Sequence, residues 1–253
     1  MNLCISYPKS GRTWLRVMLS ELGVDCDYTH LDTGAEKPSW GRHFRELRPP
    51  VAPEGARVLF LHRDPRDTVV SFFHEMTKRN RLAPGRALQF LVQGRIPPRA
   101  LGAFVRSPRF GIEKTVRFNL ACAGAVPGLH VGYEALREDP VAQLGAIIRH
   151  FGAAVAPDRI RSVVAANSFE KMREKEASGA YGTHMLRPRD PNDPDSFKVR
   201  RGKVGGWRDE MDAETQAFAN AVLARYDYFE AMRAAHPVAT QSGGLDSGRL
   251  RRA

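Results

Sequence analysis

The chain has 253 residues, of which 42% are hydrophobic and 9% aromatic, and this composition predicts one main globular domain. The formal charge of +11 favours acidic partners, although 31 of the 39 basic residues are arginine, an excess that codon bias also explains. No apolar run approaches the roughly 18 residues of a membrane span, and no leader-like segment opens the chain, so a cytoplasmic protein is predicted. Three cysteines without CxxC spacing favour neither a disulfide framework nor a zinc site.

The first predicted elements flank the stretch SYPKSGRTW. The apolar run at residues 3–5 precedes it, and apolar positions with helical spacing follow from Leu15 to Leu22, which predicts strand, loop and helix. The first N–H groups of such a helix carry partial positive charge, and Gly11 allows close approach of the backbone to a ligand. Lys9, Ser10, Arg12 and Thr13 add cations and hydroxyls that suit phosphate or sulfate. The stretch predicts an anion-binding loop; alone, it also fits a tight turn with solvated basic residues.

A second strand is predicted after a polar stretch at residues 25–53. Its apolar run, residues 58–61, leads directly into HRDPRDTVVSFFHEM. Asp64 is expected to cap a helix whose first residue is Pro65. Arg63 then stands at the carboxyl end of the strand, and Ser71 lies on the second turn of the helix. Because ligands of open α/β sheets bind at this edge, we expect Arg63 and Ser71 to face a ligand.

The remaining pattern predicts helices over 113–126, 139–151, 157–166 and 212–233 and a strand over 129–132. This alternation predicts an α/β fold with a doubly wound, mostly parallel central sheet and helices on both faces. Residues 78–111 and 174–198 lack clear periodicity and are predicted to be long functional loops or insertions. A single domain is predicted over 1–233, followed by a disordered basic tail over 234–253.

Three stretches together resemble the sulfotransferases that use 3′-phosphoadenosine-5′-phosphosulfate (PAPS). YPKSGRTW resembles the family's phosphosulfate loop, FLHRDPRDTVVSFFH its 3′-phosphate motif, and VRRGKVGGW the loop that closes over the nucleotide. GYEALREDP and SFEKMR lie between them in the order typical of the family. The resemblance covers residues 1 to about 210. It implies the P-loop-like sulfotransferase fold, PAPS as sulfuryl donor, and 3′,5′-adenosine bisphosphate (PAP) as product.

A donor with anionic groups on opposite sides of one ribose needs two anion sites. The resemblance implies that the loop at residues 9–13 binds the 5′ group, whereas Arg63, Ser71, Arg200 and Arg201 bind the 3′-phosphate beside Gly202. It also implies an adenine site, although core packing is the alternative for its aromatic residues. The implied nucleotide-binding residues are Lys9, Ser10, Gly11, Arg12, Thr13, Trp14, Arg63, Ser71, Tyr133, Ser168, Phe169, Arg200, Arg201 and Gly202. Within this set Trp14 and Phe169 enclose the adenine, and Tyr133 and Ser168 lie near its polar edge.

Two residues are implied to be catalytic, Lys9 and His43. Lys9 suits the transferring oxygens and the leaving phosphate. His43 stands before Arg63 at the spacing of the family's histidine base, and an imidazole accepts a proton near neutral pH. His30 is a less well spaced competitor. The family usually has a lysine where this chain has Gly41, so either a nearby arginine compensates or the acceptor site differs.

Two other functions compete with this interpretation. An atypical P-loop nucleotide kinase needs GxxxxGK followed by Ser or Thr, but here the lysine precedes the glycine, and the strand before Arg63 ends without an aspartate to hold a metal. Metal-independent transfer without a metal site is therefore predicted. A non-catalytic polyanion or nucleic-acid binder would spread its basic residues over a surface, whereas the informative ones here stand at strand ends.

The predicted acceptor is a small hydroxylated molecule, meaning a phenol, alcohol, natural product or glycan. No nucleic-acid or membrane partner is predicted. The oligomeric state and the individual acceptor stay open.

Overall fold

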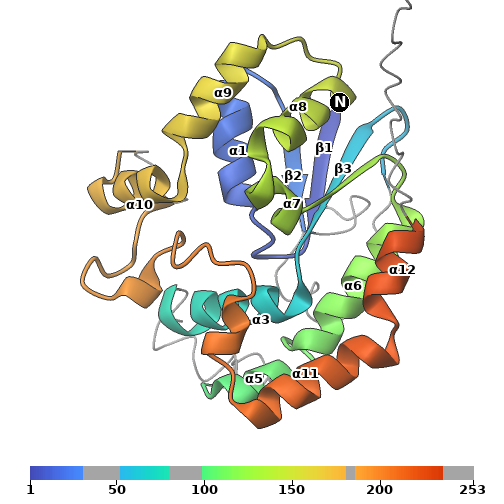
Figure 1. The fold of residues 1–253 in the computed structure, drawn as a ribbon, viewed down its shortest axis with the longest axis vertical. Helices are drawn as coiled ribbons and strands as arrows, with labels where there is room; N and C mark the ends of the chain where they lie inside the picture. The colour runs from blue at the N-terminus through green and yellow to red at the C-terminus, as the bar shows by residue number, and fades with distance from the viewer. Residues whose placement is uncertain (31–51, 80–98, 181–185, 236–253) are drawn as a thin grey trace, which may run out of the picture.

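The computed structural model describes residues 1–30, 52–79, 99–180 and 186–235 (Figure 1). Its strands are β1 (Asn2–Ser6), β2 (Asp27–Thr29), β3 (Arg57–His62) and β4 (Leu129–Gly132). Its helices are α1 (Arg12–Glu21), α3 (Pro65–His74), α5 (Leu101–Arg106), α6 (Ile112–Ala125), α7 (Tyr133–Glu138), α8 (Pro140–His150), α9 (Pro157–Ala166), α10 (Phe169–Ser178), α11 (Ala213–Arg225) and α12 (Tyr228–Ala235). A π-helical turn, η1 (Glu75–Arg79), follows α3, and 3-10 turns occur at η3 (Pro194–Ser196) and η4 (Gly206–Asp209).

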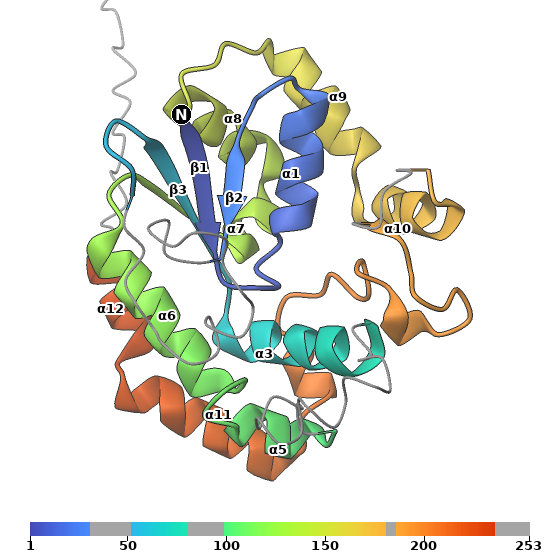
Figure 2. The same ribbon diagram turned by 180° about the vertical axis from the view of Figure 1, so that it is seen from behind.

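The four described strands form one parallel sheet in the order β2-β1-β3-β4. Leu3 pairs with Val58 and Ile5 with Phe60, so the predicted apolar runs lie side by side at the centre of the sheet (Figure 2). The chain passes from β1 to β2 on one side and then returns to place β3 on the other side of β1. The carboxyl ends of β1 and β3 therefore form the topological switch point, where open α/β sheets bind ligands.

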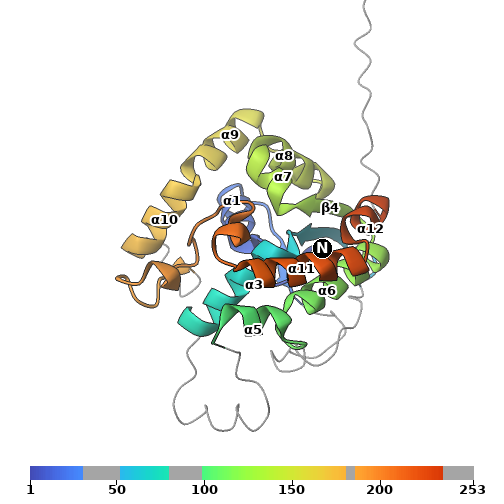
Figure 3. The same ribbon diagram turned by 60° about the horizontal axis from the view of Figure 1, so that its bottom comes forward.

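Alternate residues of the strands divide the core between the two faces of the sheet. One face, which includes Ile5 and Phe60, packs against helices α3, α5, α6, α11 and α12. The other, which includes Cys4 and Leu59, packs against α1, α7, α8 and α9. Figure 3 shows α7 and α8 on the opposite side of the sheet from α3 and α6. Because both faces are covered, the central strands β1 and β3 have continuously apolar interiors, and the predicted doubly wound α/β fold is confirmed.

The predicted elements agree with the structure where their sequence signals are strong. Asp64 caps α3 by accepting a hydrogen bond from the Arg66 N–H at 2.8 Å, and Pro65 is the first residue of that helix. The long helix predicted over 212–233 is wrong, because the chain breaks between α11 and α12 at Asp227, whose φ is 46°. Helix α12 continues to Ala235, two residues beyond the predicted domain end.

Several short elements, helix α7 among them, lie where no helix or strand was predicted. Helix α5 and part of α10 fall within the stretches predicted to be aperiodic, and β2 has only three residues, none of them buried. Of the predicted tail, residues 236–253 lie outside the described part of the chain. Within the described residues, no helix is both long and apolar enough to cross a membrane.

Candidate active site

A pocket of about 220 Å³ opens at the carboxyl edge of the sheet. Segments that follow all four strands contribute to its wall, together with α3, α10 and the segment around η4. Of the predicted residues, those that line it are Lys9, Gly11, Arg12, Thr13, Trp14, Arg63, Ser71, Tyr133, Phe169, Arg200, Arg201 and Gly202. Ser10 is fully buried and, like Ser168, is not among the residues that line the pocket, and His43 and Gly41 fall outside the described residues. The fold thus brings most of the predicted site to one pocket.

The first group of cations belongs to the loop at residues 9–13, which we call the lysine cradle. Its backbone is tightly turned, with φ of 74° at Lys9 and 93° at Gly11. Gly11 precedes α1 without any side-chain cap, so the first N–H groups of the helix are not capped by a neighbouring side chain. The Ser10 hydroxyl is fully buried and has no hydrogen-bond partner among the described residues. Such a set of donors fits an anion at the helix N-terminus.

Lys9 is held by an acidic residue of the π-helical turn that follows α3. Its Nζ lies 2.8 Å from Oε2 of Glu75, and the two side chains are only 11% and 16% exposed. Burial lowers the pKa of Lys9, and the Glu75 carboxylate opposes this effect. Burial would raise the pKa of Glu75, but Lys9 and Arg79 outweigh it and lower that pKa to about 2. Lys9 and Glu75 therefore form a buried ion pair inside the candidate site.

Arg12 contrasts with Lys9 because no acidic side chain of the described residues pairs with it. Burial, together with the neighbouring Arg16, lowers the pKa of Arg12 to about 10. The guanidinium is still charged at neutral pH. A half-buried cation on the first turn of a helix adds to the positive potential of the lysine cradle.

The ring of Tyr133 packs against both Gly11 and the guanidinium of Arg63. A Cβ atom on Gly11 would lie 2.4 Å from Cδ2 of Tyr133, so no larger residue fits there without displacing the ring. The Arg63 guanidinium lies over the same ring, 4.4 Å from its centroid, and Trp14 meets it edge-on at 6.4 Å. Tyr133 was predicted to lie near adenine, and in the structure its ring packs against Gly11 and Arg63.

The second group of cations, Arg63, Arg200 and Arg201, we call the arginine cradle. Arg63 is 9% exposed and follows β3. Its guanidinium donates hydrogen bonds to the carbonyls of Lys9 and Lys203 at 3.4 and 3.3 Å, so it joins the lysine cradle to the third motif. Its Nε is buried and has no partner among the described residues. Arg63 therefore keeps one donor for a ligand.

Asp67 fixes the third motif against helix α3. Its carboxylate accepts hydrogen bonds from the backbone N–H groups of Gly205 at 2.7 Å and Trp207 at 3.0 Å. The ring of Trp207 in turn packs under Arg66, whose guanidinium lies 4.3 Å from the ring centroid. These contacts join segments nearly 140 residues apart in sequence and position the glycine-rich loop over the pocket.

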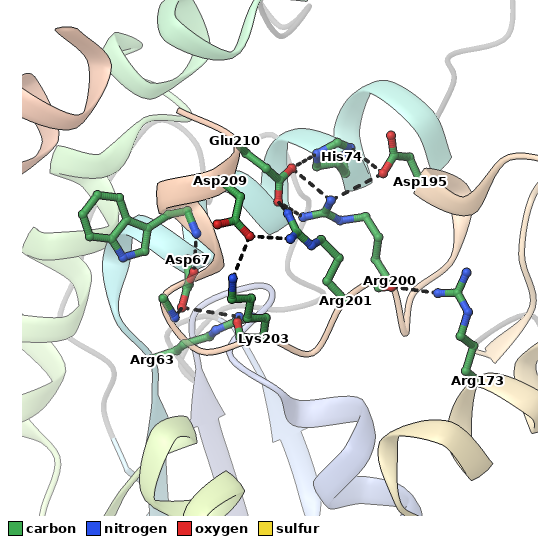
Figure 4. Close-up of polar contacts among 12 residues, drawn as sticks. Arg63, Asp67, His74, Arg173, Asp195, Arg200, Arg201, Lys203, Asp209 and Glu210 are labelled. Carbon is green, nitrogen blue, oxygen red and sulfur yellow. Dashed lines mark hydrogen bonds and ion pairs between the residues drawn. The ribbon is translucent and has the colours of Figure 1, made fainter. Parts of the chain in front are cut away.

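Arg200 and Arg201 face acidic side chains (Figure 4). The guanidinium of Arg200 donates to both carboxylate oxygens of Glu210, at 2.9 and 2.6 Å, while Arg201 contacts Asp209 at 2.5 Å and Glu210 at 3.3 Å. Burial would raise the pKa of Glu210, but hydrogen bonds from His74 and Arg200 lower it to about 2. The convergence of both arginines on a phosphate stays a prediction. Such a phosphate would compete with Glu210 for the two guanidinium groups.

The aromatic residues predicted to hold adenine line one side of the pocket. Trp14 donates from its indole N–H to the carbonyl of Asn167 at 2.7 Å, which fixes the orientation of the ring. Phe169 packs against Gly202, where a Cβ atom would lie 2.3 Å from the Phe169 ring. Ser168 caps α10 through a hydrogen bond from the Lys171 N–H, so its hydroxyl serves the helix terminus in this structure.

Of the two candidate histidine bases, His30 is the one within the described residues. It lines the pocket after β2, and its Nδ1 lies 2.7 Å from the carbonyl oxygen of Ser6. Because a carbonyl only accepts, Nδ1 carries the proton and Nε2 is the basic nitrogen. His43 stays a prediction.

Sequence reasoning missed the acidic residues of the site. Glu75, Asp67 and Glu210 lie within or beside the recognised motifs, but nothing in their spacing shows that they pair with the site's cations. The sequence offers one signal for Glu75: it stands four residues after Ser71, so on a continuous helix it would share the face of Ser71 that was expected to meet the ligand.

The fold and the two groups of cations define an α/β protein with a positively charged pocket at its switch point. Comparisons with known proteins agree. The family model described as "Sulfotransferase domain" matches residues 125–234. Mouse sulfotransferase 6B1 is 26% identical over 243 residues, which cover 85% of this chain and 71% of the relative. The chain is therefore similar to the sulfotransferases, a PAPS-dependent class of enzymes, in agreement with the resemblance of its three motifs.

Solved structures agree on the fold. The mouse sulfotransferase SULT7A1 complexed with PAP has a TM-score of 0.59 at 16% identity, and covers 92% of this chain and 86% of its own. Retinol dehydratase in complex with retinol and PAP has a TM-score of 0.54 at 16% identity, with 88% and 80% of the two chains covered. The predicted sulfotransferase fold is confirmed.

Proposed function

We propose that this enzyme transfers the sulfuryl group of PAPS to a hydroxyl group of a small-molecule acceptor, without a metal ion. The observation that carries the proposal is the convergence of two cation groups, one after β1 and one after β3, on a single pocket. Solved relatives that share the fold hold PAP, the product that such a transfer would leave. A donor with two separated anionic ends matches this arrangement.

The residues present fit such a donor. The buried Ser10 hydroxyl and the Arg63 Nε have no partner among the described residues, and α1 begins without a side-chain cap. PAPS, when bound, supplies the sulfuryl group and leaves as PAP. The lysine cradle would hold the 5′ end, and Arg63 with Ser71 would hold the 3′-phosphate.

Lys9 would perform two tasks in the reaction. Its ammonium group would stabilise negative charge on the transferring oxygens, and it would stabilise the phosphate that leaves. The proton of the acceptor hydroxyl needs a base, and we assign it to His43, with His30 as the second candidate. Substitution of each histidine by Gln separates them: only the base gives a loss of kcat of about 100-fold or more.

The acceptor is proposed to be a phenol, alcohol, natural product or glycan. Two solved structures of retinol dehydratase, which shares the fold, contain retinol and androsterone, which are small apolar alcohols. Incubation of the enzyme with PAPS and a mixed panel of hydroxylated compounds, followed by mass spectrometry, tests the proposal. A product heavier by one sulfuryl group is expected, and PAP should inhibit its formation.

The contrary result is equally definite. Salt-sensitive binding of DNA or heparin, with no protection of the protein by PAP and no sulfated product, would favour a polyanion binder instead.

A further inference from the structure

The ion pair between Lys9 and Glu75 has no part in the donor-binding scheme above. It places a carboxylate 2.8 Å from the nitrogen proposed to stabilise the transferring group. A carboxylate in an anion site repels the ligand, so its position there needs a physical reason. Glu75 also lies in a π-helical turn that continues α3, and such turns are uncommon and often re-aim side chains at functional sites.

The surroundings of Lys9 explain what a carboxylate does there. Arg79 from η1 and Lys198 from the segment after η3 bring further positive charge close to Lys9, while Glu75 from η1 and Glu176 from α10 bring negative charge. The Nε atom of Arg79 lies 3.7 Å from Glu75. Burial, together with the nearby Lys9, lowers the pKa of Lys198 to about 8. A lysine buried among other cations loses its proton readily unless a carboxylate pairs with it.

Glu176 is the other carboxylate of this surrounding, and its oxygens are already engaged. They accept the backbone N–H groups of Lys198 at 2.7 Å and Val199 at 2.8 Å. Arg79 adds a contact at 3.4 Å to the same group. Glu75 is thus the carboxylate that the structure places in direct contact with the Lys9 ammonium.

We infer that Glu75 is a positioning residue for the sulfuryl transfer: it keeps Lys9 protonated and aimed into the pocket before the donor arrives. This inference rests on the proposed function. The negative charge of Glu75 keeps Lys9 protonated, but the same charge opposes the binding of an anion. Loss of the charge should therefore lower kcat while donor affinity stays the same or increases, a split that general damage to the fold would not produce.

The variant Glu75→Gln tests this in two ways. In wild-type protein labelled with [13Cε]lysine, the eight lysines give a small set of NMR signals, and Lys9→Arg identifies that of Lys9. We expect the Lys9 pKa to fall in Glu75→Gln, because burial then acts without its counter-charge. The alkaline limb of the kcat profile should move to lower pH, and kcat at neutral pH should fall about 10- to 100-fold.

Glu214→Gln is the matched control. Glu214 pairs with Arg106 at the same 2.8 Å, but its side chain is 88% exposed and lies on α11, away from the pocket. This variant should leave kcat, PAP affinity and the Lys9 signal unchanged. Glu75→Asp keeps the charge on a shorter side chain, and should restore the Lys9 titration in part. If Glu75→Gln does not fold by circular dichroism, Glu75→Asp carries the test, with a smaller change in the same direction.

An unchanged Lys9 titration in Glu75→Gln, or in Glu75→Asp where only that variant folds, overturns the inference. The inference is also overturned if the wild type is active and the variant has the same kcat. A wild type that sulfates no acceptor counts instead against the proposed function, and the NMR titration distinguishes the two failures because it needs no donor.

Discussion

The lysine cradle and the arginine cradle carry charge of the same sign but are assembled differently. The lysine cradle is one continuous loop, and its shape follows from left-handed backbone at Lys9 and Gly11 together with the start of α1. The arginine cradle draws Arg63 from the end of β3 and Arg200 from a segment more than 130 residues later. A local loop can keep its shape through small tertiary shifts, whereas a composite site depends on every contact between its parts.

The two cradles also differ in how their charge is balanced. Lys9 has one close carboxylate, that of Glu75, and Arg12 has none among the described residues. In the arginine cradle, Arg63 lies 3.8 Å from Asp67, and Arg200 and Arg201 share Glu210. Substitutions in the first cradle should therefore act mainly on turnover, and those in the second mainly on nucleotide affinity.

The largest effect is expected for Lys9→Ala. Loss of the ammonium group should reduce kcat by about 1000-fold, because charge that develops on the transferring group loses its closest stabiliser. The affinity for PAP should fall less, since Arg12 and the helix N-terminus remain. Steady-state kinetics and calorimetric titration with PAP measure the two quantities. A larger loss of PAP affinity than of kcat would contradict the assignment of Lys9.

Arg63→Ala sharpens the comparison from the other side. Turnover should be lost in this variant as well, because the enzyme no longer binds the nucleotide. The affinity for PAP should fall about 30- to 100-fold, as is typical when a charge-assisted contact is removed from a buried site. Arg149→Ala, on the last turn of α8, provides a surface control. Equal PAP affinity in the wild type and Arg63→Ala would show that the two cradles do not divide the work in this way.

Gly11→Ala tests whether local backbone shape sets the lysine cradle. A side chain there meets Tyr133 at 2.4 Å and must adopt φ near 93°, so the variant should lose about 1–3 kcal/mol of unfolding free energy and also bind PAP more weakly. Gly124→Ala in α6 has open space around its Cβ and should be neutral or stabilised by up to about 1 kcal/mol. Urea unfolding measures both; similar stability of the two variants would refute this account.

The smallest effect is expected for Glu210→Gln. Removal of the carboxylate frees Arg200 and Arg201 for the ligand, so PAP should bind about two- to five-fold more tightly at neutral pH. The pKa of Glu210 is lowered to about 2, so its contribution to stability is complete above the ordinary value of 4.5 and is lost as pH falls from there to about 2. Acid unfolding of the wild type should show a loss over this window that is smaller in the variant. Weaker PAP binding would instead assign Glu210 to holding the arginines in place.

Much of the fold was predictable because its signals are local. The apolar runs at residues 3–5 and 58–61 are buried on both faces, and Asp64-Pro65 begins a helix as such a pair typically does. Strand β2 was not predictable: its residues Asp27, Tyr28 and Thr29 pair with β1 through the backbone and form no apolar run. The break between α11 and α12 at Asp227 was also not predictable, because helical spacing of apolar residues continues on both sides of it.

The residues of the candidate site also divide into those that the sequence predicts and those that it does not. Lys9, Arg63 and Arg201 line one pocket: left-handed backbone places Lys9, the end of β3 places Arg63, and the contacts of Asp67 with the third motif help to place Arg201. The partners Glu75 and Glu210 could not be predicted, since their approach to these cations depends on how η1 and η4 pack against the sheet edge. The role of His43 remains a prediction from spacing.

The position of the Tyr133 ring has a consequence for donor choice. Tyr133 touches the glycine of one cradle and stacks under the guanidinium of the other, so one ring sets the separation of the two charged ends. If both cradles bind one nucleotide as proposed, a nucleotide whose anionic groups are closer together or farther apart than the ring permits would not engage both. Discrimination among adenine nucleotides would then depend on distance as well as on charge, and a change at this one position would alter it at both ends together.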